Sequence, residues 1–159
     1  MIVLGVDPGT IRTGYGIVQR TGNRLTRIAS GTIKTVTDAP MEQRLLTIHE
    51  ELELIVTSHG PEKAVVEDVF FAKNAKSALK LGQVRGAILL TLARRNLPVV
   101  SYPPALVKRA IVGSGRAAKS QVQRVVQAIL RLSKLPTEDE GDALAIAICL
   151  LNASRIENI

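Results

Sequence analysis

The apolar residues at the start of the chain follow strand patterns. MIVLGV at residues 1–6 has no polar position, which is typical of a strand buried on both faces. A glycine-containing turn follows, and GYGIVQR at 14–20 predicts a second strand. TGN at 21–23 predicts a hairpin turn, and the alternation in NRLTRIASGTIKTV at 23–36 predicts a third strand. We therefore expect the chain to open with three antiparallel strands.

The rest of the pattern alternates between helix and strand. Between about Pro40 and Ser58, apolar residues recur every three or four positions, which predicts one amphipathic helix. Later segments predict, in order, a strand ending at Glu67, a helix over about 75–96, a strand at 97–102, a short helix from Pro103, a helix around 122–130 and a last helix from near Thr137. This order favours an α/β fold in a single domain over residues 1–159. We expect a five-stranded mixed sheet, with three antiparallel and then two parallel strands, and helices on both faces.

Nothing in the chain predicts a membrane segment or a disulfide. The longest apolar candidate, around 143–151, is far too short to span a bilayer, and Met1 leads into a strand without a signal-peptide pattern. Cys149 is the only cysteine and lies in an apolar segment, which favours a buried thiol. His49 and His59 are expected at the surface. Together these features favour a cytoplasmic protein.

Charge is distributed unevenly along the chain. The formal net charge is +7, yet residues 69–137 contain no Asp or Glu and thirteen Lys or Arg. A solvated surface of an ordinary basic protein is one explanation. The length of the acid-free stretch favours another, a continuous face that binds the phosphates of a nucleic acid.

Acidic residues stand where the predicted strands end and where the last helix begins. Asp7 and Glu67 each close a buried strand, and Asp139 and Asp142 are three apart at the start of the helix, where TEDE at 137–140 also predicts a capping box. Each acid alone could be structural, in a turn, an ion pair or a helix N-terminus. If the fold brings all four together, their charges require neutralisation, and oxygen ligands favour two Mg²⁺ or Mn²⁺ ions. Such a pair can activate water against a phosphodiester, which suggests a nuclease.

Four motifs carry a resemblance to a known family. In order along the chain they are GVDPGTIRTGYG, VVEDVFFAKNAKSALKLGQVRG, VKRAIVGSGRAAKSQV and DEGDALAIAI. Together they resemble the RuvC family of Holliday junction resolvases over nearly the whole chain. The resemblance implies an RNase H-like fold and a homodimer that cuts two strands of a four-way DNA junction symmetrically with Mg²⁺. It also implies ligatable nicks with 5′-phosphate and 3′-hydroxyl ends, and branch-migration partners of the RuvA and RuvB type.

The resemblance also assigns residues. The catalytic and metal-binding acids fall on Asp7, Glu67, Asp139 and Asp142, with Glu138 and Glu140 as alternatives to Asp139 for the fourth ligand. Lys108 and Lys119 match basic residues near the active site. The residues expected to bind DNA are Phe70, Lys73, Lys76, Lys80, Arg85, Lys108, Arg116 and Lys119.

The two phenylalanines of the chain are adjacent and follow Glu67 closely. The family pattern places a base-stacking aromatic ring at Phe70, which could wedge into the unstacked crossover of a junction. Phe71 is expected to anchor the loop by packing, and core packing of both rings is the alternative.

Two segments also resemble phosphate-binding turns of other proteins. DPGTIRTGYG is similar to the phosphate-binding turn of actin-like ATPases, but that fold needs a second domain that 159 residues cannot supply. GSGRAAKS at 113–120 lacks the glycine that a P-loop has before its lysine. Another RNase H-like nuclease and a non-catalytic junction-binding protein both stay open. So does the role of the small residues Ala78, Gly82 and Gly86, which suit packing inside the domain or against a second subunit equally well.

Overall fold

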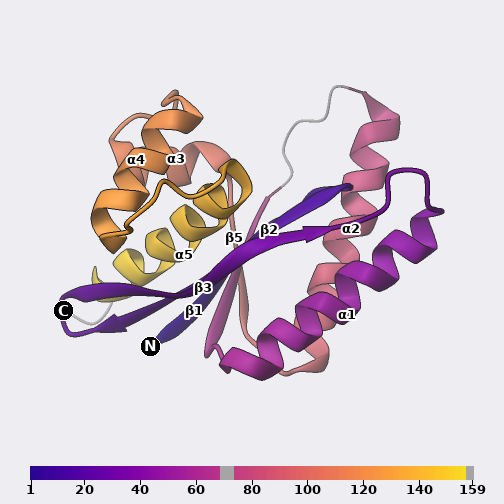
Figure 1. Cartoon of the computed structure of the whole chain (residues 1–159), viewed down its shortest axis with the longest axis horizontal. Helices are drawn as coiled ribbons and strands as arrows, with labels where there is room; N and C mark the ends of the chain where they lie inside the picture. The colour runs from indigo at the N-terminus through magenta and orange to yellow at the C-terminus, as the bar shows by residue number, and fades with distance from the viewer. Residues whose placement is uncertain (69–73, 157–159) are drawn as a thin grey trace.

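One five-stranded sheet forms the centre of the molecule (Figure 1). The computed structural model describes residues 1–68 and 74–156, with side chains up to Ser154. The strands are β1 (Ile2–Asp7), β2 (Arg12–Thr21), β3 (Arg24–Lys34), β4 (Lys63–Glu67) and β5 (Val99–Tyr102). Their order across the sheet is β3-β2-β1-β4-β5, with antiparallel pairing among the first three and parallel pairing from β1 to β4 and β5. The predicted mixed sheet is confirmed.

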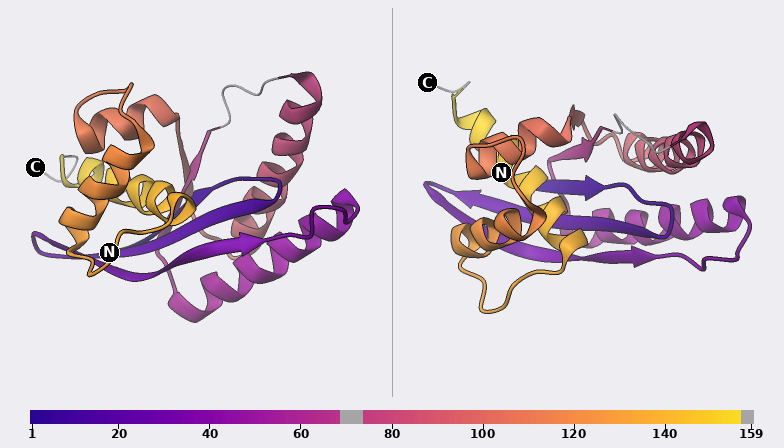
Figure 2. Two further views of the ribbon diagram at one scale, coloured as in Figure 1. Left: turned by 45° about the horizontal axis from the view of Figure 1, so that its top comes forward. Right: turned by 90° about the horizontal axis from the view of Figure 1, so that it is seen from above.

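The helices form two groups. They are α1 (Met41–His59), α2 (Ala75–Arg94), α3 (Pro104–Val112), α4 (Lys119–Leu130) and α5 (Glu138–Ile156). In both views of Figure 2, α1 and α2 lie together, and α3, α4 and α5 gather away from them. Each group closes a separate hydrophobic core against one face of the sheet, so the prediction of helices on both faces is also confirmed.

Strand β1 contributes to both cores. Val3 faces the core under α3, α4 and α5, whereas Leu4 and Val6 face the core under α1 and α2, and all three side chains have 0% exposure. Successive side chains of a strand point to opposite faces, so a strand covered on both sides must be apolar at every position. This explains the unbroken apolar run at the start of the chain, and it makes Asp7 the first polar group on the strand.

Helix α5 lies unusually close to the sheet. A β-carbon added at Gly5 would come 2.1 Å from the carbonyl oxygen of Ala143, and one added at Gly14 would come 2.2 Å from that of Asp139. Glycine at these positions lets the helix backbone touch β1 and β2 directly. Although residues 143–151 of α5 are all buried, none of the described helices is long and apolar enough to cross a membrane.

His49 is half-buried between two helices, which differs from the surface position expected for it. Its Nδ1 lies 2.8 Å from Thr91 Oγ1, between α1 and α2, and Thr91 has 0% exposure. The Thr91 hydroxyl donates its only hydrogen to the carbonyl of Ala87, so His49 must donate from Nδ1. Sequence reasoning could not find this because the contact joins residues 42 positions apart.

Candidate active site

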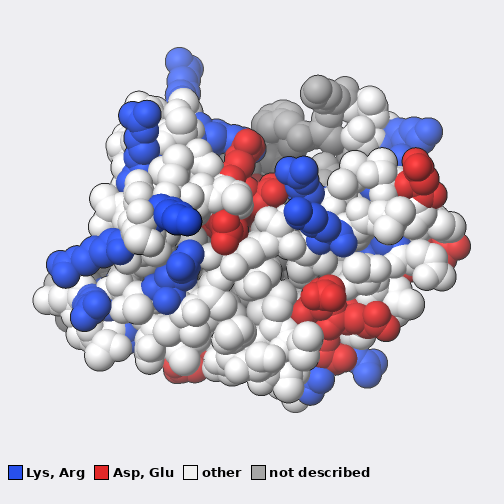
Figure 3. Space-filling view, viewed as in Figure 1, with Lys and Arg blue, Asp and Glu red and all other residues white. Residues whose placement is uncertain are grey.

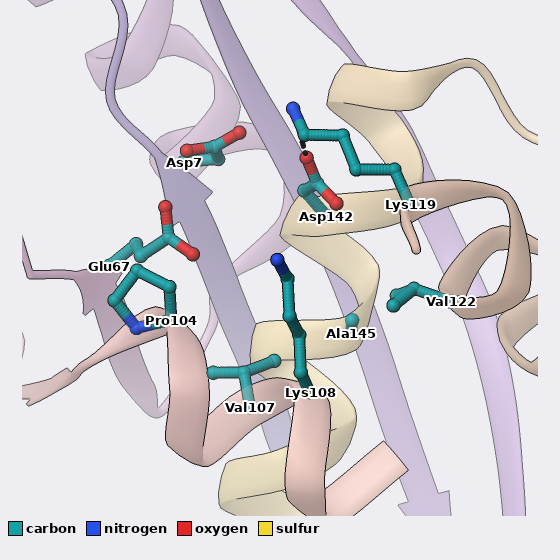
Figure 4. Close-up of a pocket in the computed structure, with 9 residues that line it drawn as sticks. All are labelled: Asp7, Glu67, Pro104, Val107, Lys108, Lys119, Val122, Asp142 and Ala145. Carbon is teal, nitrogen blue, oxygen red and sulfur yellow. Dashed lines mark ion pairs between the residues drawn. The ribbon is translucent and has the colours of Figure 1, made fainter. Parts of the chain in front are cut away.

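Two carboxylates meet where adjacent strands end. Strands β1 and β4 run parallel with Val6 opposite Val66, so Asp7 and Glu67 follow at the same edge of the sheet. Helix α5 adds Asp142, and the three acids point into one pocket of about 250 Å³ (Figure 4). The residues lining this pocket are Asp7, Glu67, Pro104, Val107, Lys108, Lys119, Val122, Asp142 and Ala145. Three of the four predicted acids are thus brought together.

Burial and mutual repulsion disfavour ionisation of these acids. Burial, followed by the charge of Glu67 and then a hydrogen bond to it, raises the pKa of Asp7 to about 9. Burial also raises the pKa values of Glu67 and Asp142, although nearby lysines oppose the shift. At neutral pH the pocket therefore holds a proton, or needs a cation, to balance its carboxylates.

Two lysines supply positive charge at the pocket. Lys119 Nζ lies 3.5 Å from Asp142 Oδ2 and also contacts the carboxylate of Glu138. The hydrogen bond to Glu138 raises the pKa of Lys119 to about 12, so Lys119 stays charged. Lys108 projects from α3 towards the acids (Figure 4). Both lysines lie where their charge can act on an anion bound between them and the acids.

Asp139 faces a different pocket from the one lined by Asp7, Glu67 and Asp142. It lines a pocket of about 360 Å³ with Arg12 and Lys34, not the pocket of the other three acids. Seen down the helix axis, position 138 is about 40° to one side of Asp142 and position 139 about 60° to the other. Glu138 consequently reaches Lys119, while Asp139 turns towards β2 and β3.

The first turn of α5 is fixed by the predicted capping box, which is confirmed. The backbone N–H of Thr137 and its hydroxyl donate to Glu140 Oε2 at 3.1 and 2.9 Å, and Glu140 N–H donates to Thr137 Oγ1 at 3.4 Å. Ser30 on β3 donates to the other oxygen of Glu140 at 3.0 Å. Glu140 is therefore engaged in holding α5 on the sheet.

A second set of contacts, which the sequence did not reveal, holds the loop that follows Asp7. Arg44 on α1 has 8% exposure and donates from Nη2 to the carbonyl of Thr10 at 2.8 Å. The hydroxyl of Thr13 donates to the carbonyl of Gly9 at 3.0 Å. These bonds satisfy backbone acceptors in the turn and fix the end of β1.

The residues expected to bind DNA are distributed unevenly. Lys108 and Lys119 line the acidic pocket, Arg116 lies between α3 and α4, and Lys76 and Lys80 are exposed on α2. Arg85 is partly buried, with an ion pair to Asp68 at 3.6 Å and a hydrogen bond to Ser101 at 2.6 Å. Phe70, Phe71 and Lys73 lie outside the described residues.

The three carboxylates of the pocket are suitable ligands for divalent cations, although their oxygens are too far apart to bind one ion together. Within residues 1–68 and 74–156, no three His, Cys, Asp or Glu side chains stand at metal-ligating distances from a common point. The chemistry still fits, because Asp7, Glu67 and Asp142 offer hard oxygen ligands, and a cation would favour the ionised forms that burial disfavours by raising their pKa values.

A mixed sheet of this topology, with carboxylates converging from two strand ends and a crossing helix, defines an RNase H-like nuclease. A sequence profile described as "Crossover junction endodeoxyribonuclease RuvC" matches residues 3–150. The chain belongs to the RuvC family. It is 49% identical over 154 residues to the protein of that name from Sorangium cellulosum, covering 97% of this chain and 86% of that one. It is also 49% identical over 149 residues to that of Syntrophotalea carbinolica, covering 94% and 92%.

Solved structures agree with this assignment. "T. thermophilus RuvC in complex with Holliday junction substrate" superposes with a TM-score of 0.93 at 33% identity, covering 99% of this chain and 96% of that one. The yeast mitochondrial Holliday junction resolvase Ydc2 has a TM-score of 0.69 at 13% identity, with 98% and 82% covered, and so shares the fold.

Proposed function

We propose that this protein, a Holliday junction-resolving endonuclease by its family, cuts DNA at the pocket of Asp7, Glu67 and Asp142. The observation that carries the proposal is the meeting of these three acids at the ends of two adjacent parallel strands and on α5. The reaction is hydrolysis of a phosphodiester, which leaves 5′-phosphate and 3′-hydroxyl ends. Two symmetric nicks then resolve the junction into duplexes that can be ligated.

The cleavage requires divalent cations, and we expect two Mg²⁺ ions, with Mn²⁺ as a substitute. Asp7, Asp139 and Asp142 would hold one ion, and Asp7 and Glu67 the other. For Asp139 this requires its side chain to turn from the pocket of Arg12 and Lys34, and Glu138 is the alternative ligand. When bound, such ions lower the pKa of a water molecule and stabilise the leaving oxygen.

The protein's own cations complete the site. Lys108 and Lys119 border the carboxylates, so they can orient the scissile phosphate and stabilise the negative charge that develops on it. Lys119 is held by Glu138 and Asp142, which fixes its ammonium group at the edge of the pocket. The apolar Val107 and Val122 line the same pocket and limit the water around the reacting phosphate.

Basic residues outside the pocket would bind the arms of the junction through their phosphates. Figure 3 shows Lys and Arg side chains on both sides of the acidic patch. The residues we assign to this contact are Lys73, Lys76, Lys80, Arg85 and Arg116, while Lys108 and Lys119 would bind DNA within the pocket. Phe70 would stack on an unpaired base at the crossover, where stacking is worth about 1–3 kcal/mol per base.

A homodimer would place two such sites on a two-fold symmetric junction. One exposed face of α2 suits the interface. Leu79 and Leu90 are 71% and 62% exposed, and a β-carbon added at Gly82 or Gly86 between them would meet none of the described residues within 4 Å. Such a smooth apolar stripe favours close packing against a second copy. We further propose a cytoplasmic location and branch-migration partners of the RuvA and RuvB type.

Cleavage of a synthetic four-way junction tests the proposal. Wild-type protein with Mg²⁺ should introduce paired nicks at symmetric positions near the crossover. Asp7→Asn should bind the junction with unchanged affinity and cut it at least about a thousandfold more slowly. If wild-type protein made no incision in junctions with mobile cores of varied sequence, the proposed function would be wrong.

A further inference from the structure

A basic surface runs from the catalytic pocket along α4 to the tip of the β2–β3 hairpin. Helix α4 begins with Lys119 at the catalytic pocket and ends at its C-cap, Arg131. Arg131 lines a pocket of about 360 Å³ whose other lining residues are Asn23, Arg24, Leu25 and Ile129, so none of the described residues that line it is acidic. The surface that we call the distal arginine pocket is therefore linked to the site of cleavage by one helix.

The exposed side of α4 carries one further arginine and no acid. Arg124 lies between the two ends of the helix, and residues 119–130 contain no Asp or Glu. Arg124 is exposed, and Arg131 directly follows the last residue of the helix. In the described part of the chain, no carboxylate comes within ion-pair distance of Arg24, Arg124 or Arg131. Their charges are available to an external anion.

Arg131 occupies a position that favours glycine. Among the described helix ends, four are closed by a left-handed residue: α1 and α3 use Gly60 and Gly113, α2 is followed by Asn96, and α4 uses Arg131 with φ of 52°. A residue with a β-carbon adopts this conformation at a cost, and helix termination alone would be served better by glycine. The arginine is thus more easily explained by what its side chain binds than by the fold.

We infer that the distal arginine pocket binds the phosphate backbone of a junction arm, several base pairs away from the cut. This inference rests on the proposed function. Helix α4 has 12 residues and so spans about 18 Å, which is about five base-pair steps of DNA. Continuity with the catalytic pocket favours DNA over an acidic protein partner, because a duplex held by Lys119 reaches Arg24 and Arg131 along the same helix.

The length of the junction arms tests the inference. Binding is measured in the Asp7→Asn background, so that the junction stays intact, with arms of about 4 or about 15 base pairs closed by hairpin loops. The variant is Arg24→Ala with Arg131→Gly. The glycine suits the left-handed cap, so the variant should melt at or above the temperature of its parent.

We expect the variant to bind the long-armed junction about tenfold more weakly and the short-armed junction as tightly as its parent. The slope of log affinity against log salt should fall by about 2 for the long arms alone. The matched control, Arg94→Ala with Arg95→Ala, removes two charges from the end of α2, which packs on the other face of the sheet. It should bind both junctions as its parent does.

If the variant bound the long-armed junction as tightly as its parent, the inference would be wrong. The pocket would then be expected to bind another polyanion, such as an acidic protein segment. Equal losses for both arm lengths would overturn it as well, because the contact would then lie at the crossover. The proposed function fails separately, if wild-type protein does not cut the same junctions in Mg²⁺.

Discussion

The backbone carbonyl of Asp139 lies directly on Gly14, so close that a β-carbon at Gly14 would come within 2.2 Å of it. Gly14 is the cross-strand partner of Asp7. This contact sets the distance of α5 from the strand that ends in Asp7, the first of the proposed catalytic acids, and hence the depth at which Asp142 enters the pocket.

Replacing Gly14 with alanine should therefore separate α5 from the sheet. We expect Gly14→Ala to lower the free energy of unfolding by about 2–3 kcal/mol, because backbone cannot move aside as a flexible side chain does. At a temperature where the variant is folded, its junction affinity should hold while its cleavage rate falls at least tenfold. Urea unfolding and single-turnover cleavage measure the two effects.

Gly22→Ala is the control for this variant. A β-carbon at Gly22 would meet none of the described residues within 4 Å, so any loss of stability there reflects its positive φ alone and should leave the cleavage rate unchanged. A stable, fully active Gly14→Ala would show that the contact with Asp139 does not set the position of α5.

The raised pKa of Asp7 predicts a pH-dependent stability without metal. A carboxyl whose pKa is about 9 in the folded state, against an unperturbed 3.8, binds its proton more tightly when folded. Folding stability is therefore lost as the pH rises from about 4 towards 9. Asp7→Asn has no proton to lose, so without metal it should be more stable than wild type at pH 8 and nearly equal at pH 4. Thermal melts in chelator across this range measure the difference. An Asn variant that melts lower than wild type at pH 8 would show that burial and the charge of Glu67 do not disfavour ionised Asp7 as described.

Substitutions of Lys119 and Glu138 should differ sharply in their effect on the cleavage rate, although the two side chains form an ion pair. Lys119→Met should slow cleavage about a hundredfold with little loss of junction affinity, because it removes a cation beside the scissile phosphate. Glu138→Gln should change the rate less than about threefold, since an exposed ion pair contributes little and Asp142 still holds the lysine. Single-turnover cleavage at saturating enzyme distinguishes them. If Glu138→Gln matched the loss of Lys119→Met, Glu138 would be a ligand rather than a partner of the lysine.

If the exposed face of α2 around Leu79 and Leu90 forms the dimer interface, a charge placed there should prevent dimerisation. Leu79→Glu places a charge in the proposed apolar interface, so it should give a monomer in sedimentation experiments at micromolar concentration. Its cleavage of a supercoiled cruciform should yield nicked circles rather than linear product, because the two incisions are no longer coupled. Leu54→Glu on α1, where the leucine is 63% exposed, is the matched control and should remain dimeric. A dimeric Leu79→Glu would exclude this face.

Phe70 lies outside the described residues, so its role remains a prediction from the motif. Phe70→Ala should weaken junction binding by about 1–3 kcal/mol and slow cleavage, because a stacked base is lost. Affinity for linear duplex should stay unchanged, since its bases are paired. Normal cleavage of junctions by the variant would show that Phe70 is no wedge.

The sequence by itself determined the order of elements and predicted most of the residues of the candidate site. Local rules were sufficient: a strand buried on both faces must be apolar throughout, a helix on a core repeats every three or four residues, and a carboxylate is costly at a buried strand end. Asp7 and Glu67 stood out for that reason, Asp142 was predicted with Asp139 from the start of the last helix, and four motifs in order identified the family.

Only the tertiary structure decided which groups face one another. Asp139 and Asp142 are three apart in sequence. Because α5 packs closely on Gly14, Asp139 lies near Arg12 and Lys34, whereas Asp142 lies near Asp7. Arg24 and Arg131 are far apart in the sequence, and the packing of α4 beside the β2–β3 hairpin brings them to one pocket. Such contacts depend on register, helix rotation and the absence of a β-carbon at one position, and none of these leaves a periodic signal along the chain.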